Sequence, residues 1–276
     1  MRKQPGKPEK PVGLPYWHTF WVCCGVLWGL VGFCGGCLLG IYFLAMWDFW
    51  VVWSGGFGGL VSFWRVGIML VFDVGFNCGL WSRDFLGRFP GSRVVGVEAN
   101  VDLCGGVVGS GVILVNGLCG VVDGGVGLFN VCVGNPDISS GVPEFMGVVR
   151  HRGWYGVEFG GVVVREVPLV SLDGLVGRFG VPDVLKLDVE GGELGCLLGL
   201  SCRVGVVCFE FCEEFWGGGL LCVDRLVELG YCEFGVSFGV DRFVDGGDLV
   251  WGGRDWVVGE VVSRFDGGCW GMLYAR

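Results

Sequence analysis

The sequence predicts an α/β protein in which helices cover both faces of a mostly parallel sheet, preceded by a hydrophobic amino-terminal extension. From about residue 66, short apolar segments alternate with segments whose charged residues recur at helical spacing, which is typical of such a sheet. Polar side chains also stand where several of the apolar segments end. Residues 1–65 differ, because they hold long stretches without a charged residue. We therefore expect two domains, residues 1–65 and residues 66–276.

The composition limits how much a single residue can indicate. Glycine accounts for 56 of the 276 residues, and Lys186 is the one lysine after Lys10. Gly, Val, Trp, Cys and Phe have codons rich in G and T, which indicates a base bias in the gene rather than a selected glycine architecture. A glycine is therefore weak evidence for a site in this chain, whereas an asparagine or a lysine is stronger evidence.

Composition and charge also exclude several classes of protein. Hydrophobic residues make up 52% of the chain and charged residues 17%, so the chain is not intrinsically disordered. A net charge of −9 disfavours a nucleic-acid partner. The 15 cysteines are odd in number and irregularly spaced. We expect them to be reduced and buried as small apolar residues rather than paired in disulfides.

The amino-terminal domain combines a basic tail with uncharged stretches. Residues 1–12 are rich in Lys, Arg and Pro, and neither residues 20–47 nor residues 49–64, on either side of Asp48, hold a charge. About 20 apolar residues suffice to cross a bilayer as a helix. We expect a hydrophobic helical extension that associates with a membrane through residues 20–64, as one span or as a hairpin of two. The basic tail would stay inside the cell, and two spans would leave the following domain in the cytoplasm. The alternative is an ordinary helix that covers the domain.

The elements expected after residue 66 alternate between strands and helices. Residues 71–74 are apolar around one acid and predict a strand, and residues 78–89 carry apolar and charged residues at helical spacing. The later expected strands, in order, are 94–98, 112–115, 162–167, 184–188, 204–210, 256–262 and 269–274. The later expected helices are 101–108, 171–179, 190–200 and 219–230. A hairpin is expected at 121–133, around the turn Asp123-Gly124-Gly125.

Polar residues stand where four of the expected strands end. These residues are Asp73, Glu98, Asn116 and Asp188. In an open α/β sheet the ligand lies beyond the carboxyl ends of the strands, where the strand order reverses, so we expect these side chains at a ligand site. Glu98 ends the second strand and follows Gly79 by 19 residues. An acid at that place can accept hydrogen bonds from ribose hydroxyls.

The turn after the first strand favours a ligand without phosphate. Residues 71–79 read VFDVGFNCG, which is D-x-G-x-N-x-G rather than the GxGxxG of dinucleotide-binding turns. A pyrophosphate prefers bare helix N–H groups, whereas an acid suits a positive or neutral group. S-adenosylmethionine carries a sulfonium, an amino group and a ribose, so the turn favours that cofactor over NAD. Gly75 and Gly79 would let the backbone approach the ligand closely.

The stretch from about residue 69 to 235 resembles the FkbM-type family of S-adenosylmethionine-dependent methyltransferases, in motifs, order and spacing. VFDVGFNCG resembles the VxDVGANxG loop of the family, and VVGVEANVDLC resembles its second strand, with an acid and Asn before a helix. ILVNGLCGVVDGGVGLFNV resembles the third strand with its hairpin, and NPDISS resembles the serine-bearing stretch that follows. The most specific match is VPLVSLDGLVGRFGVPDVLKLDVEGGELGCLLGL, which resembles a Leu-Asp-rich helix followed by LLKxDxEGxE. VVCFEF and LVELGY resemble the next strand and helix. Phe76 stands where the family favours Ala, and Gly192 where it often has Ala.

The resemblance implies a Rossmann-like class I methyltransferase sheet, mostly parallel with an antiparallel carboxy-terminal strand, and S-adenosyl-L-methionine as cofactor. It implies that the methionine end lies against Asp73, Gly75, Asn77 and Gly79, the ribose against Glu98, and the adenine near Asn116 and Gly117, with Asn100 also at the cofactor. Asp188 and Glu190 would face the methyl group and the acceptor.

The resemblance further implies methyl transfer, commonly to a hydroxyl oxygen. We expect a small-molecule, glycan or lipid acceptor, such as a sugar, a lipid or a natural product. A hydroxyl acceptor needs a proton acceptor, for which Asp188 is the first candidate and His151, the one histidine of the second domain, the other. No cluster of three metal ligands is expected. The segments 136–160 and 236–256, where acceptor contacts would lie, do not identify the acceptor.

Several alternatives stay open from the sequence. The chain could be a catalytically silent relative that binds the cofactor or a partner, or an NAD-dependent oxidoreductase, which the missing GxGxxG disfavours. Single residues have structural alternatives too. Glu190 could cap its helix, Lys186 could pair with an acid across the sheet, and Asn116 could close a turn.

Overall fold

The computed structural model describes residues 68–276 apart from 107–110, 153–160, 241 and 245, and it leaves the side chains of 105–106 and 148–152 undescribed. Before residue 68 it describes only the backbone of five strands. The chain divides into two compact units, Met1–Gly67 and Ile68–Arg276.

The described part of the first unit is an antiparallel sheet rather than a helix. Its strands pair in sequence order: β1 (Trp17–Val22), β2 (Leu27–Cys34), β3 (Cys37–Leu44), β4 (Phe49–Ser54) and β5 (Val61–Arg65). The predicted hydrophobic helical extension is therefore wrong. Glycines recur through these segments and cost a helix about 0.5–1 kcal/mol each, whereas aromatic and β-branched residues favour strands. Among the described residues, no helix is both long and apolar enough to cross a bilayer. Membrane association through residues 20–64 stays a prediction.

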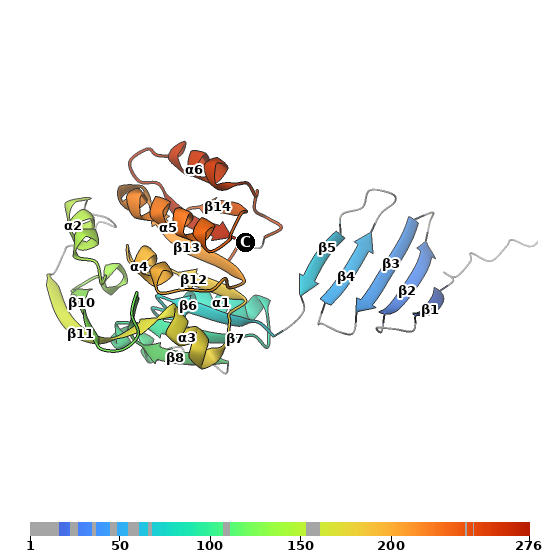
Figure 1. The fold of residues 1–276 in the computed structure, drawn as a ribbon, viewed down its shortest axis with the longest axis horizontal. Helices are drawn as coiled ribbons and strands as arrows, with labels where there is room; N and C mark the ends of the chain where they lie inside the picture. Colours follow the sequence, from blue (N-terminus) through green and yellow to red (C-terminus); the bar gives the residue numbers. More distant parts are fainter. Residues whose placement is uncertain are drawn as a thin grey trace, which may run out of the picture. The chain divides into compact units, whose positions relative to one another are not determined.

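The second unit is built on a seven-stranded sheet (Figure 1). Its order is β14 (Phe234–Phe238), β15 (Trp270–Ala275), β13 (Val206–Cys212), β12 (Val184–Leu187), β6 (Leu70–Val74), β7 (Arg93–Glu98) and β8 (Val112–Asn116). The five strands from β13 to β8 are parallel, and β15 runs antiparallel to both β13 and β14. The predicted sheet, with its antiparallel carboxy-terminal strand, is confirmed. The strand order reverses between β6 and β12, which makes this the switch point.

Helices cover both faces of this sheet, because successive residues of each buried strand point to opposite faces. Val71 packs with Trp81 and Phe85 of α1 (Leu80–Arg88) on one face. Phe72 belongs to the core on the other face, against which four helices pack. These are α3 (Leu172–Phe179), α4 (Glu193–Leu198), α5 (Trp216–Glu228) and α6 (Arg254–Val262).

A three-stranded sheet lies between β8 and β12 in the chain, with the order β10 (Val126–Cys132), β11 (Val162–Ser171) and β9 (Leu118–Gly120). The predicted hairpin at 121–133 is wrong, since β9 and β10 each pair with β11 and not with each other. The turn between them is tied to β11 instead, where Asp123 Oδ1 accepts a hydrogen bond from the Ser171 backbone N–H at 3.1 Å.

Two further expectations about elements are wrong. The strand predicted at 256–262 is helix α6, whose buried residues Val257 and Val261 are four apart and so share one helix face. The helix predicted from Glu190 begins at Glu193, so Glu190 does not lie at the helix terminus. The remaining elements are the 3-10 turns η1 (Val101–Gly106), η2 (Pro136–Ile138) and η4 (Glu213–Phe215), and helix α2 (Pro143–Arg152).

Candidate functional site

A cleft of about 360 Å³ opens at the carboxyl ends of β6, β7 and β12, at the switch point of the sheet. The loop after β6, the end of β7, residues 117–119 and the stretch 135–139 line one part of it. The loop after β12, Glu210 of β13 and Trp270 of β15 line the other part. Segments far apart in the chain thus meet where an open α/β sheet binds its ligand.

The loop after β6 is held in a tight turn that only certain residues can adopt. Gly75 has φ of 82°, and a Cβ there would overlap the carbonyl oxygen of Asp188. The N–H of Gly75 donates to the Val97 carbonyl at 3.0 Å. Asn77 has φ of 51°, a left-handed conformation that Asn tolerates better than most residues. Its side-chain Nδ2 donates to Asp137 at 2.9 Å, which ties the loop to η2.

Phe76 fits this loop because two glycines leave room for its ring. Phe76 is 2% exposed, and a Cβ on Gly79 or on Gly96 would overlap the ring. Gly79 also begins α1 with φ of 74°. The phenylalanine that replaces the alanine favoured by the family is thus accommodated by the missing side chain at Gly96 in β7.

Glu98 joins the loop after β6 to the end of β7. Its side chain is buried, with Oε2 accepting the Asn77 backbone N–H and Oε1 accepting the Asn100 backbone N–H, both at 2.7 Å. Burial raises the pKa of Glu98. The two backbone hydrogen bonds and the charge of Lys186 lower it, but burial has the larger effect. Glu98 lines the cleft, and each carboxylate oxygen keeps a second acceptor position.

The three other residues predicted at the cofactor near Glu98 lie at different depths. Gly117 lines the cleft. Asn116 is exposed outside the lining, and its Nδ2 donates to the Glu98 carbonyl at 3.0 Å. Asn100 is buried outside the lining, and its side-chain Oδ1 accepts from Arg165 at 3.3 Å.

Lys186 of β12 lines the cleft and pairs with Asp73 of β6 in the sheet. Its Nζ is 3.1 Å from Asp73 Oδ1, 3.2 Å from Asp188 Oδ2 and 3.2 Å from the Gly75 carbonyl oxygen. The sequence interpretation that Lys186 pairs with an acid across the sheet is confirmed. Asp73 is fully buried outside the lining, and its Oδ2 accepts a hydrogen bond from Ser82 Oγ at 2.6 Å.

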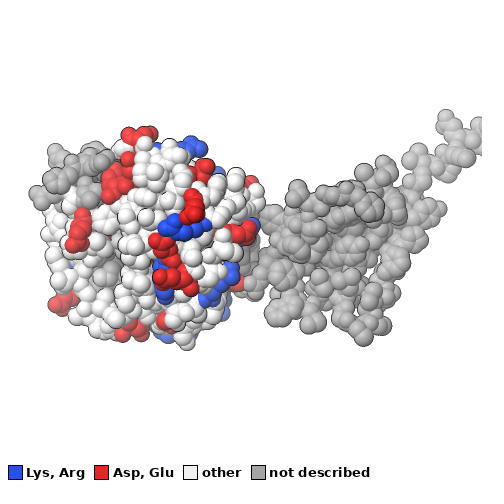
Figure 2. Space-filling model, turned by 45° about the horizontal axis from the view of Figure 1, so that its top comes forward, with Lys and Arg blue, Asp and Glu red and all other residues white. Residues whose placement is uncertain are grey.

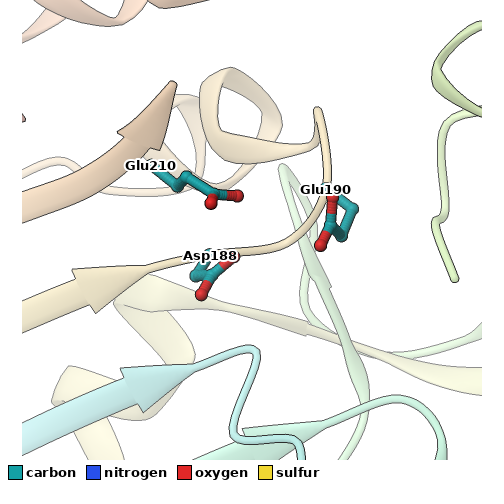
Figure 3. A group of neighbouring side chains, drawn as sticks. All are labelled: Asp188, Glu190 and Glu210. Atoms are coloured by element: carbon teal, nitrogen blue, oxygen red, sulfur yellow. The ribbon is translucent and has the colours of Figure 1, made fainter. Parts of the chain in front are cut away.

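Three carboxylates meet at the other side of the cleft: Asp188, Glu190 and Glu210, with one oxygen of each within 4.8 Å of the others (Figure 3). Glu190 has φ of 56°, and its carbonyl accepts a hydrogen bond from Ser140 Oγ at 2.6 Å. Burial first, and then the charge of Asp188, raise the pKa values of Glu190 and Glu210 well above the ordinary range. Such a group can surround a cation, but acids alone do not define a metal site, and we assign none.

Sequence reasoning missed Glu210, and the structure does not test the prediction for His151. Glu210 is the last residue of the strand expected at 204–210, so the rule that selected Asp188 would also have selected Glu210. His151 lies in α2, and its side chain falls outside the described residues.

The charge of the cleft limits its ligands. Five acids line it: Glu98, Asp137, Asp188, Glu190 and Glu210. Lys186 is the one basic side chain of the lining within the described part of the chain, and it already has two acidic partners. Such a cleft suits a ligand with a neutral or positive reactive group and opposes a phosphate.

The sheet order, the cleft at its switch point and the acid at the end of β7 define an α/β protein of the methyltransferase type. The family described as Methyltransferase FkbM domain matches residues 73–233, which is more than half of the chain. The protein belongs to this family, as its sequence motifs predict.

Solved structures give weaker similarities. A precorrin-6y C5,15-methyltransferase from Geobacter metallireducens is 14% identical, with a TM-score of 0.38, and the match covers 75% of this chain and 78% of that one. A methyltransferase FkbM from Methylobacillus flagellatus is 14% identical, with a TM-score of 0.42, over 76% of this chain and 44% of that one. Similarities of this size carry no inference about activity. The curated proteins include no significant match.

Proposed function

We propose that the protein is an S-adenosyl-L-methionine-dependent methyltransferase that methylates a hydroxyl oxygen of a small-molecule, glycan or lipid acceptor. The observation that carries the proposal is the acid-lined cleft at the switch point, with Lys186 as its one basic lining residue in the described part of the chain. NAD would bring a pyrophosphate toward these carboxylates, whereas the sulfonium and ammonium of S-adenosylmethionine carry the opposite charge.

The described residues fit this cofactor. The free acceptor positions of Glu98 suit the two ribose hydroxyls, and Gly117 lines the cleft where the adenine would lie. Gly75 and Asn77 shape the loop for the methionine end. Asp73 would act through Lys186, since it lies beneath the loop and does not line the cleft. When bound, the cofactor supplies an electrophilic methyl group on sulfur.

The acceptor would bind on the side of Asp188 and Glu190. Positioning and exclusion of water contribute most to a displacement of this kind, because the protein forms no bond to the reacting carbon. Carboxylates there can take the proton that a hydroxyl loses. This chemistry supports oxygen as the methylated atom.

Isothermal titration calorimetry tests the choice of cofactor. We expect S-adenosylhomocysteine to bind the wild-type protein and NAD to show no binding under the same conditions. A methyl-transfer assay against sugar, lipid and natural-product alcohols would then separate an active enzyme from a silent relative. Binding of NAD without binding of S-adenosylhomocysteine would contradict the proposal and favour an oxidoreductase.

A further inference from the structure

The methionine end of S-adenosylmethionine carries an ammonium group, for which a carboxylate is the strongest hydrogen-bond acceptor that a protein side chain offers. The family resemblance predicts Asp73 as the acid at this end. In the structure Asp73 is fully buried outside the cleft lining, where Ser82 Oγ donates to it at 2.6 Å and Lys186 Nζ lies 3.1 Å away. A carboxylate for the ammonium group therefore has to come from another element.

Asp137 reaches the loop after β6 from a different wall of the cleft. It lies on η2 and lines the cleft, and its Oδ1 accepts a hydrogen bond from Asn77 Nδ2 at 2.9 Å. Its other oxygen, Oδ2, has no partner among the residues that the structure describes. Asp137 is also exposed, so a ligand in the cleft can reach this second oxygen.

The stretch that carries Asp137 is held in place by the protein itself. Ser140 exchanges two backbone hydrogen bonds with Asn130 of β10, at 2.9 and 3.0 Å. Ile138, the residue after Asp137, is buried in an apolar cluster. Because these contacts and the bond to Asn77 already fix the carboxylate, a ligand that binds to it pays little additional ordering entropy.

The other acids of the lining stand elsewhere. The described side chains that hydrogen-bond to the loop after β6, residues 75–79, are those of Glu98, Asp137 and Lys186. Glu98 stands at the end of β7, where the ribose would lie, and both of its oxygens accept backbone N–H groups. The three remaining acids of the lining lie in β13 or follow β12. Asp137 is therefore the acid that combines contact with this loop and a carboxylate oxygen open to the cleft.

We propose that Asp137 binds the ammonium group of the cofactor, an inference that rests on the proposed function. An ammonium N–H donates to Asp137 Oδ2, while Asn77 keeps Oδ1 oriented. The acid for the amino group thus comes from η2 rather than from the end of β6. The stretch 135–139 then forms the wall of the cleft against which the methionine end lies.

Calorimetry with two ligands isolates this contact. The ligands are S-adenosylhomocysteine and its deamino analogue, in which a hydrogen replaces the amino group and the carboxylate is kept. We expect the wild-type protein to bind S-adenosylhomocysteine about 10–100-fold more tightly than the analogue, because the analogue lacks the charged hydrogen bond.

Asp137→Asn removes the charge and keeps an oxygen for Asn77. The variant should lose most of the preference for S-adenosylhomocysteine and keep its affinity for the analogue, which also shows that it is folded. Asp137→Glu retains a carboxylate and should restore part of the preference. Asp84→Asn removes an exposed acid of α1 outside the lining and should keep the whole preference.

The outcomes separate this inference from the proposed function. If the preference persists in Asp137→Asn, or is lost in Glu190→Gln instead, another group binds the amino group and the assignment is overturned. An equal loss of affinity for both ligands in Asp137→Asn would show a structural role and would overturn it too. If the wild-type protein binds both ligands equally well, the inference fails while the proposed function stands. If it binds neither ligand, the proposed function itself fails.

Discussion

Lys186 is the residue on which the arrangement of the site depends most. It contacts an acid in β6, an acid after β12 and the carbonyl of the tight loop, and its side chain is 4% exposed. A buried cation with two carboxylate partners leaves an uncompensated charge when it is removed. Lys186 thus connects the loop after β6 to the side of the cleft where, under the proposed function, the acceptor would bind.

Lys186→Met is expected to lower the free energy of unfolding by about 3–5 kcal/mol, because Asp73 and Asp188 lose their shared cation. The double variant Lys186→Met/Asp73→Asn should recover part of this loss. Urea denaturation measures both values. Asp84→Asn breaks the exposed pair with Arg88 and serves as the control, with an expected effect of about 0.3–0.5 kcal/mol. An equally small effect of Lys186→Met would contradict the role given to this lysine.

The sequence predicts which residues stand at the strand ends but not which way each one faces. Glu98 and Asp188 do line the cleft. Asp73 shares a strand face with Val71, which packs against α1. Its side chain therefore points toward α1, where it contacts Ser82, and away from the cleft. The direction of Asp73 depends on which face of β6 packs against α1. The short apolar sequence of β6 does not show which face that is. Glu210 was missed although the same strand-end rule applies to it.

At the scale of elements, the loop after β6 and strand β7 fit together through one pair of residues. The ring of Phe76 occupies the space that a side chain at Gly96 would fill. In a chain so rich in glycine, Gly96 carried no signal in the sequence, although its contact with Phe76 gives it a specific role. Phe76 therefore fits at this position because residue 96 of β7 is a glycine.

Gly96→Ala is expected to destabilise the protein by about 1–3 kcal/mol, because the new methyl group overlaps the Phe76 ring in a packed core. In the background of Phe76→Ala the same change should cost much less, which a double-mutant cycle by urea denaturation measures. Gly87→Ala is the matched control: nothing lies within 4 Å of its added Cβ, and it should stabilise α1 by about 0.5–1 kcal/mol. Additive effects of the Gly96 and Phe76 changes would contradict the proposed fit.

Elements were predicted best where strands and helices alternate. The parallel strands and α1, α3 and α5 lie within a few residues of their predicted positions. The failures have separate physical causes. By hydropathy alone, the amino-terminal segment of glycine and large apolar residues predicts a hydrophobic helix. The pairing of β9 and β10 depends on β11, which is distant in the chain. The four valines of α6 favour a strand in the sequence.

At the scale of the whole molecule, buried acids dominate the electrostatics. Figure 2 shows one face of the described surface, where acidic and basic side chains lie scattered among uncharged ones. The carboxylic acids with raised pKa values instead line or adjoin the cleft, as Glu98, Glu190, Glu193 and Glu210 do. Burial is the largest cause at each of them, so folding brings these acids together against their preference for water.

This distribution predicts that stability falls as pH rises through the weakly acidic range. Burial raises the pKa of Glu193 from its ordinary 4.5 to about 7, so between these values the folded protein binds more protons than the unfolded chain. The free energy of unfolding then decreases with increasing pH. Urea denaturation at pH values across this interval measures the slope, which Glu193→Gln should reduce. Glu213 has the opposite effect on stability, because hydrogen bonds from four backbone N–H groups lower its pKa. Its effect falls below this pH interval. A stability that rises between pH 4.5 and 7 would contradict the prediction.

The central claim is that the cleft at the switch point binds an S-adenosyl cofactor through Glu98. The most direct test is calorimetric titration of the Glu98→Gln variant with S-adenosylhomocysteine, beside the wild-type protein and Glu228→Gln, which changes an exposed acid on α5. Loss of charged hydrogen bonds to the ribose costs about 1.5–3 kcal/mol, so we expect affinity about 10–100-fold weaker in Glu98→Gln and unchanged in Glu228→Gln. Wild-type affinity in a folded Glu98→Gln variant would contradict the placement of the cofactor.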